Sequence, residues 1–459
     1  MNLHRLLLQR AADRNPLRVA LIGAGKFGSM FLSQARHIPA MHVVAVADLD
    51  PARARASLAR VGWAPEQFEA HSLDAALRSG STYITDDSLS AIASDTIDIV
   101  IDATGNPVAG IRHALLCADH GKHIVMVNVE ADALAGPLLA KRARQAGVVY
   151  SLAYGDQPAL ICEMVDWARA VGFEVVAAGK GTKFLPAYHD STPDTVWGHY
   201  GFAPQQVEEG DFNPQMFNSF LDGTKSAIEM AAVSNATGLT PAPSGLEFPA
   251  CGTDDLPRVL KPRSEGGVLH HRGQVEVVSS LERDGTPVFR DLRWGVYVTF
   301  AGDSDYVRRC FNEYGLLTDE SGNYTAMYKP YHLIGLELGI SVASIGLRRE
   351  ATGVPDEFRA DAVAVAKRDL SSGATLDGEG GYTVYGRLMP AADSLRAHAL
   401  PIGLAHGVKL TRAVNKGRPV TWDDVVAPDS QAVRARREME LLYAPDTAAR
   451  NVMPELLRS

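Results

Sequence analysis

Short apolar runs alternate with helical segments over the first third of the chain. The runs are four to seven residues long and are bounded by turn residues or acids, as buried strands of a parallel sheet are. The runs that we expect to form strands are residues 19–22, 43–47, 97–103, 123–127 and 148–152. Their alternation with helices predicts an α/β fold with a doubly wound parallel sheet and helices on both faces.

A glycine-rich turn follows the first run. Gly23, Gly25 and Gly28 have the spacing G-x-G-x-x-G between a strand and a helix, and the next strand ends at Asp48. Together these parts form the dinucleotide-binding unit of a Rossmann domain, in which phosphates bind the free N–H groups of the helix. A glycine turn that binds no ligand is the alternative. The expected cofactor contacts are Gly23, Gly25, Lys26, Phe27, Gly28, Asp48, Thr104, Gly105 and Asn128.

Asp48 favours NAD as the cofactor. Its carboxylate can accept hydrogen bonds from the ribose hydroxyls, and it would repel the 2′-phosphate of NADP. Arg53 and Arg55 follow closely and weaken this repulsion, so NADP remains an alternative.

The pattern changes after residue 153, where longer polar stretches separate the predicted elements. The polar stretch 184–214 is longer than an inert connection, which favours a loop that covers an active site. The two strands predicted in this region alternate apolar and polar residues and favour an open antiparallel sheet. The predicted elements are a strand at 174–178 with a glycine-flanked turn at 179–183, a helix at 220–234, strands at 275–281 and 294–300, and an apolar helix at 331–346 that returns to the first domain or to a dimer interface.

A linker at residues 355–358 precedes a small β-rich module. Within it, the phrase Lys367-Arg368-Asp369-Leu370 is echoed by Thr411-Arg412-Ala413-Val414, which predicts two related halves. A charged amphipathic helix is predicted at 430–442.

Lysines are the best candidates for the chemistry, because hydride transfer to a carbonyl leaves negative charge on oxygen. Asp222 and Lys225 lie three residues apart on one predicted helix and would face the same way, although a surface ion pair is the alternative. Lys180 and Lys183 in the glycine-flanked turn could hold a phosphate or carboxylate of the substrate, or be solvated.

Several acids and one histidine are candidates for substrate or cation binding. Glu130 and Asp132 should face the cofactor end of the sheet, unless they cap a helix predicted from residue 134. Asp156 and Glu163 with Glu229 could supply oxygen ligands to a divalent cation. His332 stands at a predicted helix start, where it could contact the substrate or have only a structural role.

Composition narrows the class of protein. The chain has 459 residues, 46% of them hydrophobic, which is typical of an ordinary globular protein with more than one domain. A net charge of -9 without a basic run argues against nucleic acid as the main partner. Four scattered cysteines indicate neither a disulfide framework nor a zinc site, and no segment has the length of a membrane span. We therefore expect a cytoplasmic protein.

The chain resembles the homoserine dehydrogenase-like oxidoreductases, most closely the 1-deoxy-D-xylulose 5-phosphate reductoisomerase-like (DRL) proteins. The final module resembles an SAF domain. The segments that carry the resemblance are residues 23–28, 102–107, 127–132, 155–158, 178–182, 228–239, 265–269 and 330–337.

The resemblance implies four parts and a set of roles. It implies an NAD(P)-binding domain at 1–153, a substrate and dimerisation domain at 154–350, an SAF-like domain at 360–428 and a helical tail at 429–459. It also implies an acid and a lysine at the reaction centre, which Asp222 and Lys225 match. The family's lysine after the residue matching Asn128 is absent, which argues against homoserine as the substrate.

We therefore expect an NAD(P)-dependent oxidoreductase that acts on a small polar carbonyl or hydroxyl compound bearing phosphate or carboxylate, and that forms a homodimer or higher homo-oligomer. The reductoisomerase reaction is one alternative. A non-catalytic regulator that senses NAD is another.

Overall fold

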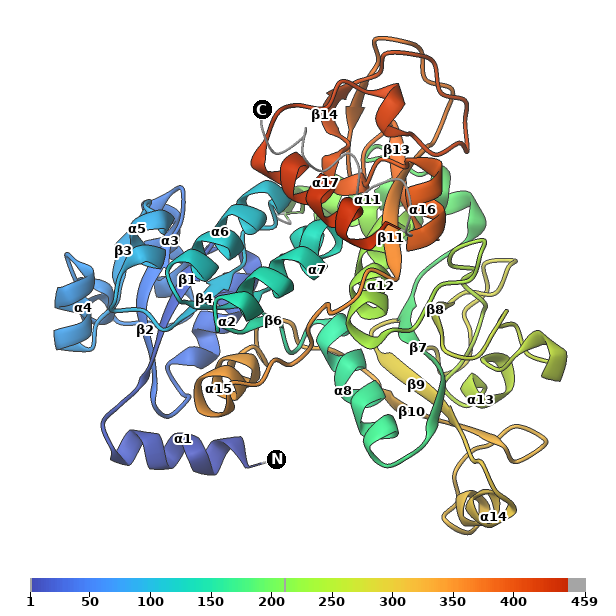
Figure 1. The fold of residues 1–459 in the computed structure, drawn as a ribbon, viewed down its shortest axis with the longest axis horizontal. Coiled ribbons are helices and arrows are strands. Elements are labelled where there is room, and N and C mark those ends of the chain that lie inside the picture. Colours follow the sequence, from blue (N-terminus) through green and yellow to red (C-terminus); the bar gives the residue numbers. More distant parts are fainter. Residues whose placement is uncertain (1, 210–211, 445–459) are drawn as a thin grey trace. The chain divides into compact units, whose positions relative to one another are not determined.

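The computed structural model describes residues 2–209 and 212–444. The chain forms two compact units (Figure 1). The first contains Met1–Cys162 and His332–Asp356, and the second contains Glu163–Tyr331 and Glu357–Ser459. The predicted domain limits are not tested by this division and stay predictions.

The first unit is built on a six-stranded parallel sheet with the strand order β3-β2-β1-β4-β5-β6. The predicted Rossmann sheet is therefore confirmed, with strand order reversing between β1 and β4 at the point where such sheets bind dinucleotides. The strands are β1 (Leu17–Ile22), β2 (Met41–Ala47), β3 (Tyr83–Thr85), β4 (Ile99–Asp102), β5 (His123–Met126) and β6 (Tyr150–Leu152). The helices that accompany them are α1 (Leu3–Ala12), α2 (Lys26–Ala35), α3 (Pro51–Arg60), α4 (Leu73–Ser79), α5 (Ser88–Ala93), α6 (Pro107–Asp119) and α7 (Val129–Gln145), and α8 (Gln157–Ala170) follows the last strand.

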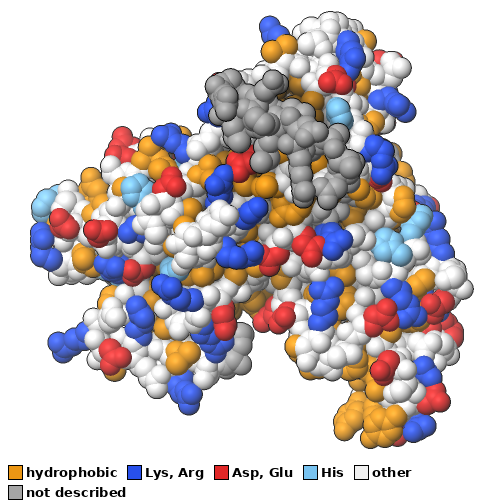
Figure 2. All heavy atoms as spheres, in the orientation of Figure 1, with side chains coloured by type: hydrophobic (Ala, Val, Ile, Leu, Met, Phe, Trp, Pro, Cys, Tyr) orange, Lys and Arg blue, Asp and Glu red, His pale blue; other side chains and the backbone are white. Residues whose placement is uncertain are grey.

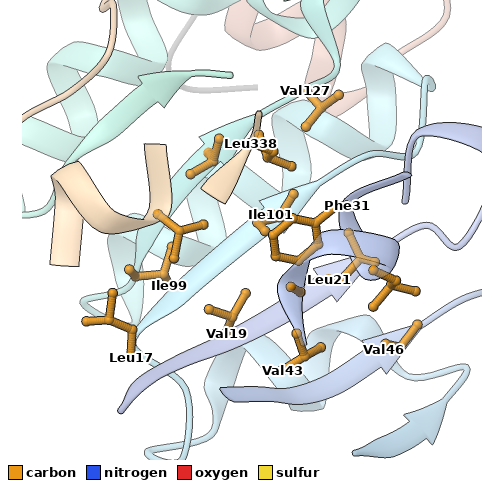
Figure 3. Close-up of a cluster of buried hydrophobic side chains, with 14 of the residues drawn as sticks. Leu17, Val19, Leu21, Phe31, Val43, Val46, Ile99, Ile101, Val127 and Leu338 are labelled. Atoms are coloured by element: carbon orange, nitrogen blue, oxygen red, sulfur yellow. The ribbon is translucent and has the colours of Figure 1, made fainter. Parts of the chain in front are cut away.

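Branched side chains of the central strands form the core of this unit. Val19 and Leu21 of β1 pack with Ile99 and Ile101 of β4, all fully buried (Figure 3). Leu338, far along the sequence, joins the same core just before α15 (Gly339–Arg348). The predicted return of the chain to the first domain is thus confirmed. The helix predicted at 331–346 is shorter than expected, because residues 334–338 form turns before α15 begins.

The second unit contains a four-stranded sheet with the order β10-β9-β7-β8. The predicted antiparallel sheet is corrected here to a mixed one, because β7 pairs with β8 in parallel and with β9 antiparallel. The long connection between β7 and β8, which includes a helix, permits the parallel pairing. The strands are β7 (Glu174–Thr182), β8 (Gln274–Ser279), β9 (Val296–Ala301) and β10 (Tyr324–Lys329); the helices are α9 (Val196–Tyr200), α10 (Pro204–Glu209), α11 (Pro214–Leu221), α12 (Thr224–Thr237), α13 (Leu256–Val259) and α14 (Asp305–Glu313).

The C-terminal module of this unit has two small antiparallel pairs, β11 with β13 and β12 with β14. The echoed phrases meet each other, since Leu370 and Val414 exchange backbone hydrogen bonds of 2.8 and 2.9 Å. Arg436 of the last helix is fully buried and pairs with Asp361 of β11. The elements are β11 (Ala360–Ala366), β12 (Thr375–Asp377), β13 (Val384–Pro390), α16 (Ala391–Ala397), β14 (His406–Lys409) and α17 (Gln431–Tyr443). The end of the predicted tail, residues 445–459, lies outside the described residues.

The surface carries mixed charges. On the face shown in Figure 2, Lys and Arg side chains lie among Asp and Glu side chains, and an apolar group lies at the end of the second unit that carries α14. Tyr306, Tyr314 and Leu317 are exposed in this region. None of the helices in the described part of the chain has both the length and the apolar character needed to cross a membrane.

Candidate functional site

The glycine turn has the geometry that dinucleotide binding requires. Gly23 has φ +98°, and a Cβ there would lie 2.6 Å from the carbonyl oxygen of Ala103. A Cβ on Gly28 would lie 2.2 Å from the carbonyl oxygen of Gly23, so only glycine lets α2 approach the turn. Around Gly25 a Cβ would meet no atom within 4 Å. Gly25 is exposed at the N-cap of α2, and Lys26 and Phe27 begin that helix, whose first N–H groups have no partner within the helix.

Asp48 lies directly beside this turn. Its Oδ2 accepts a hydrogen bond of 2.8 Å from the N–H of Ala24, and its Oδ1 accepts one of 3.0 Å from the N–H of Asp50. Arg53 forms an ion pair of 2.6 Å with the same Oδ1, while its own side chain stays mostly exposed. Arg55 instead donates to the carbonyl of Phe68. Of the two arginines, the one that partly neutralises Asp48 is therefore Arg53.

A hydrogen-bond network joins the ends of β4 and β5. Asn128 is buried at the N-cap of α7, and its Nδ2 donates to the Thr104 hydroxyl (3.2 Å) and to the carbonyl of Asn106 (2.7 Å). The Thr104 hydroxyl in turn donates to Asp102 Oδ1 at 2.8 Å. Gly105, at φ +66°, is exposed in the same turn. Two of the expected cofactor contacts, Thr104 and Asn128, are thus joined by hydrogen bonds at the ends of neighbouring strands.

The two acids of the next helix are in different surroundings. Helix α7 begins at Val129, five residues earlier than predicted, so both acids lie in its first turn and Asn128 provides the cap. Glu130 is half-buried. Asp132 is fully buried and accepts a hydrogen bond of 2.8 Å from the Tyr150 hydroxyl. Burial raises the pKa of Asp132 to about 7.

Two further predicted residues lie in turns of the first unit. Asp156 is buried and accepts from the N–H of Gln157 at the start of α8. His332 is half-buried but stands seven residues before α15, so its predicted place at a helix start is wrong. The turn after it packs closely on α2, since a Cβ on Gly335 would lie 2.8 Å from the carbonyl oxygen of Phe27.

In the second unit, the predicted single helix carrying Asp222 and Lys225 is two helices. Asp222 ends α11 and Gly223, with φ +91°, breaks the chain direction before α12 begins. A carboxylate that accepts the N–H of Thr224 (2.9 Å) and a glycine in the left-handed region favour this break. Asp222 is fully buried, and Lys225 is half-buried in the first turn of α12. The two residues therefore do not share one helix face.

The partner of Asp222 is a lysine that the sequence did not single out for chemistry. Lys367, at the end of β11 in the C-terminal module, forms a buried ion pair of 2.7 Å with Asp222. Its Nζ also donates to the carbonyls of Ser191 (2.7 Å) and Gly381 (2.8 Å). Burial raises the pKa of Asp222, and the charge of Lys367 opposes that rise. Lys367 could not be found from spacing, because it lies far from Asp222 in the sequence.

His189 is a second residue that the sequence left without a role. Its Nδ1 is 2.7 Å from the backbone carbonyl oxygen of Asp222, which fixes the ring as a donor at that nitrogen. The ring stacks on Tyr385 of β13, with centroids 4.5 Å apart. Burial lowers the pKa of His189. Both His189 and Lys367 thus tie the start of α12 to surrounding loops and to the C-terminal module.

Lys180 lies within β7, so its predicted place in a turn is wrong. The strand continues to Thr182 because it pairs with strands on both sides. Lys180 is buried and forms an ion pair with Glu229 of α12, which is also buried. Lys183 follows the strand, is half-buried, and donates to the carbonyl of His199 at 2.6 Å.

Glu163 and Glu229, the predicted cation ligands of the second unit, belong to no group of metal-binding side chains among the described residues. Glu229 pairs with Lys180, and Glu163 is exposed on α8. Within residues 2–209 and 212–444, no group of three or more His, Cys, Asp or Glu side chains is placed to hold a metal ion.

Family models match three parts of the chain. The model "Oxidoreductase family, NAD-binding Rossmann fold" matches residues 17–127, "Oxidoreductase DRL, catalytic domain" matches residues 155–338, and "SAF domain" matches residues 361–426. The chain is therefore an oxidoreductase that combines an NAD-binding Rossmann domain, a DRL catalytic domain and an SAF domain. The resemblances to the DRL proteins and to an SAF domain are confirmed. Asp222, Lys225, Lys180 and Glu229 all lie within the DRL catalytic domain.

Several solved structures are similar to the chain at low identity. A homoserine dehydrogenase from Thiobacillus denitrificans is 15% identical, with 76% of this chain and 82% of that chain covered and a TM-score of 0.44. The 3-ketoreductase KijD10 from Actinomadura kijaniata is 18% identical over 38% of this chain, with a TM-score of 0.25. A myo-inositol dehydrogenase from Lactobacillus casei is 17% identical over 40% of this chain, with a TM-score of 0.27. The matches span about half of the latter two proteins, 50% and 52%. No curated protein matches the sequence.

Proposed function

We propose that the protein transfers a hydride between C4 of the nicotinamide and a small polar carbonyl or hydroxyl compound that bears a phosphate or carboxylate. Lys225 is the proposed acid and base. In reduction, the hydride adds to the carbonyl carbon, the C=O electron pair moves to oxygen, and the Lys225 ammonium donates a proton to that oxygen. In oxidation the neutral amine accepts the proton from the hydroxyl.

The observation that supports this role most is the set of ionised groups at the start of α12. Lys225 and Glu229 are four residues apart and therefore lie on the same face of this helix, and Glu229 is neutralised by Lys180. The Asp222–Lys367 pair fixes the residues immediately before the helix. A half-buried lysine held on a rigid helix start can keep its position through the reaction, which a solvated surface lysine cannot.

Cofactor binding is assigned to the glycine turn, Asp48 and the turn at 104–106, with Glu130, Asp156 and His332 as candidate substrate contacts. We expect NAD to be preferred because Asp48 is buried beside the turn, where the ribose hydroxyls would reach it. Arg53 forms an ion pair with the Asp48 carboxylate and could bind a 2′-phosphate, so NADPH binding should be measurable but weaker than NADH binding. A homodimer or higher homo-oligomer remains our expectation.

The test combines cofactor binding with turnover. NADH and NADPH are titrated into the purified chain, and a panel of sugar phosphates, polyols and hydroxy acids is then screened for oxidation or reduction. With an active compound, Lys225→Met should lower kcat roughly 10²–10⁴-fold while NADH binding is unchanged. Lys409→Met, which removes an exposed lysine of β14, is the matched control and should keep full turnover. Full turnover by Lys225→Met would overturn the proposed role.

The reductoisomerase reaction is the second candidate, and the match to the DRL catalytic domain favours it. A preference for NADPH, together with its oxidation on addition of deoxyxylulose phosphate, would make that reaction the answer. Cofactor binding without turnover of any compound in the panel would instead favour an NAD-sensing regulator.

A further inference from the structure

Two cations meet at one end of the sheet in the second unit. Lys183 directly follows β7, and Arg293 precedes β9, the strand that pairs with β7 antiparallel. Lys183 Nζ lies 5.8 Å and Arg293 Cζ lies 5.9 Å from the centre of the Tyr200 ring. Both cations are half-buried. Two positive charges from segments next to neighbouring strands therefore lie close to the same tyrosine ring.

Gly181 brings these two segments together. A Cβ at this position would lie 1.9 Å from the carbonyl oxygen of Leu292 and 2.9 Å from the N–H nitrogen of Arg293. The N–H of Gly181 also donates to the carbonyl of Gly295 at 3.0 Å. The turn that carries Arg293 thus crosses β7 at a distance that only glycine permits.

The charge of this pair is not neutralised within the described part of the chain, where neither cation contacts a carboxylate. Lys183 Nζ donates to a backbone carbonyl, that of His199, and Arg293 lies over the rings of Tyr200 and Trp294 (4.7 Å). Burial, together with the charge of Arg293, lowers the pKa of Lys183. Two half-buried like charges that repel each other are unfavourable alone and become favourable when an anion binds between them.

The neighbours of the pair favour a negatively charged ligand as well. Burial and the positive charge of Lys183 both lower the pKa of His199, which places this ring beside the cation pair. Tyr188, whose ring lies 4.8 Å from that of His199, offers a hydroxyl group that can donate to an anion, whereas the Tyr200 hydroxyl donates to the carbonyl of Phe217 at 3.5 Å. Burial raises the pKa of Tyr200 to about 12, so its hydroxyl keeps the proton.

Aromatic contacts link the pair to the start of α12. Phe184, the residue after Lys183, packs edge-on against His189 with ring centres 5.0 Å apart. His189 in turn bonds the backbone carbonyl of Asp222, three residues before Lys225. The cation pair therefore belongs to the same end of the second unit as the proposed acid and base.

We propose that Lys183 and Arg293 form the subsite for the anionic group of the substrate, and that a phosphate ester is preferred to a carboxylate. This inference rests on the proposed function for its biological meaning. It replaces the predicted pair of Lys180 and Lys183, because Glu229 neutralises Lys180. A planar guanidinium beside an ammonium can bond two or three oxygens of a phosphate dianion, whereas a carboxylate offers two oxygens and one charge.

Inorganic phosphate and acetate are the probes, titrated by calorimetry into the full chain without cofactor. We expect one phosphate per chain, weaker binding of acetate, and a decline of both with added sodium chloride. Lys183→Met and Arg293→Met should each weaken phosphate binding at least about tenfold, since each removes a charge-assisted hydrogen bond to the anion. Arg293→Lys should recover part of the loss. Lys409→Met, which removes an exposed lysine of β14, should bind phosphate as the wild type does.

Unchanged phosphate binding in both Lys183→Met and Arg293→Met would overturn the proposed subsite. A wild-type protein that binds neither phosphate nor acetate would overturn it as well. Stronger binding of acetate than of phosphate would overturn the preference for a phosphate ester. Intrinsic tryptophan fluorescence, to which Trp294 next to Arg293 contributes with the other four tryptophans, gives a second readout of occupancy and shows whether each variant keeps its fold. Because phosphate binding is measured without cofactor and without turnover, loss of the subsite can be told apart from failure of the proposed reaction.

Discussion

Replacement of Lys367 by methionine should destabilise the second unit strongly. The side chain has similar length, so the packing changes little, but the Asp222 carboxylate loses the cation that lies 2.7 Å away. The exposed fractions of the Lys367 and Asp222 side chains are 3% and 0%, so water cannot replace the lost partner. Breaking a buried pair by removing one partner costs about 3–5 kcal/mol. For a unit of this size the loss corresponds to a fall of roughly 10 °C in Tm.

The pH dependence follows from the direction of the pKa shift. Burial raises the pKa of Asp222 above its unfolded value, and loss of Lys367 removes an effect that opposes this rise. The native state of Lys367→Met therefore binds a proton at Asp222 more tightly than the unfolded chain does. Its free energy of unfolding falls as pH rises between the unfolded and folded pKa values. The deficit relative to wild type should be larger at pH 8 than at acid pH.

The measurement is the free energy of unfolding, obtained by calorimetry over a range of pH. A chain of two units need not unfold in one step, so hydrogen exchange at residues 222–226 assigns the transition to the second unit. The double variant Asp222→Asn with Lys367→Met is the matched control. It removes both charges and should regain most of the lost stability. The Gly381 carbonyl loses its donor at a cost of about 1–3 kcal/mol, whereas the Ser191 carbonyl still accepts from Asn218 Nδ2 at 3.1 Å. A loss below about 1 kcal/mol in Lys367→Met, or a double variant no more stable than the single one, would refute the reasoning.

Further predictions concern the first unit. Gly28→Ala should destabilise the fold, since its Cβ would lie 2.2 Å from a backbone oxygen. Gly25→Ala has open space around the Cβ, so it should keep the wild-type Tm and weaken NADH binding about tenfold or more. Thermal unfolding and NADH titration of both variants separate the two effects. Asp132→Asn should raise Tm at pH 8 but not below pH 4. The folded pKa of Asp132, about 7, exceeds its ordinary value of 3.8, so the wild-type native state loses stability as pH rises between these values. Equal Tm differences at both pH values would contradict this.

The sequence was sufficient to predict the first unit because its signals are local. Strand, glycine turn, helix and acid follow one another within 17–48, and each has a backbone or packing cause that is visible in the order of residues. The limits of the elements depend on tertiary contacts and were less well predicted. Helix α15, for example, starts at Gly339 because the preceding turns are held against α2 through Gly335.

The candidate site of the second unit could be predicted only in part, because its electrostatics are not local. The spacing of Asp222 and Lys225 favoured one helix, but nothing in that spacing shows that Gly223 turns the chain between them. Lys180 was expected in a turn because glycines flank it; the sheet pairing that keeps it in β7 involves residues about 100 positions further along the chain. Tertiary pairing thus decided which lysine is neutralised and which is available to a ligand.

The two echoed phrases of the C-terminal module show why Lys367 matters beyond the module's own fold. Leu370 and Val414 occupy equivalent positions in the two phrases and pair with each other, so they stabilise the module's own fold. The residue equivalent to Lys367 in the second phrase is Thr411, which is exposed. The fold of one half therefore does not require a lysine at this position. The lysine occurs only in the first half, where it forms an ion pair with Asp222. This asymmetry indicates that the SAF module does more than dock on the catalytic domain, because it supplies the charge that fixes the start of α12.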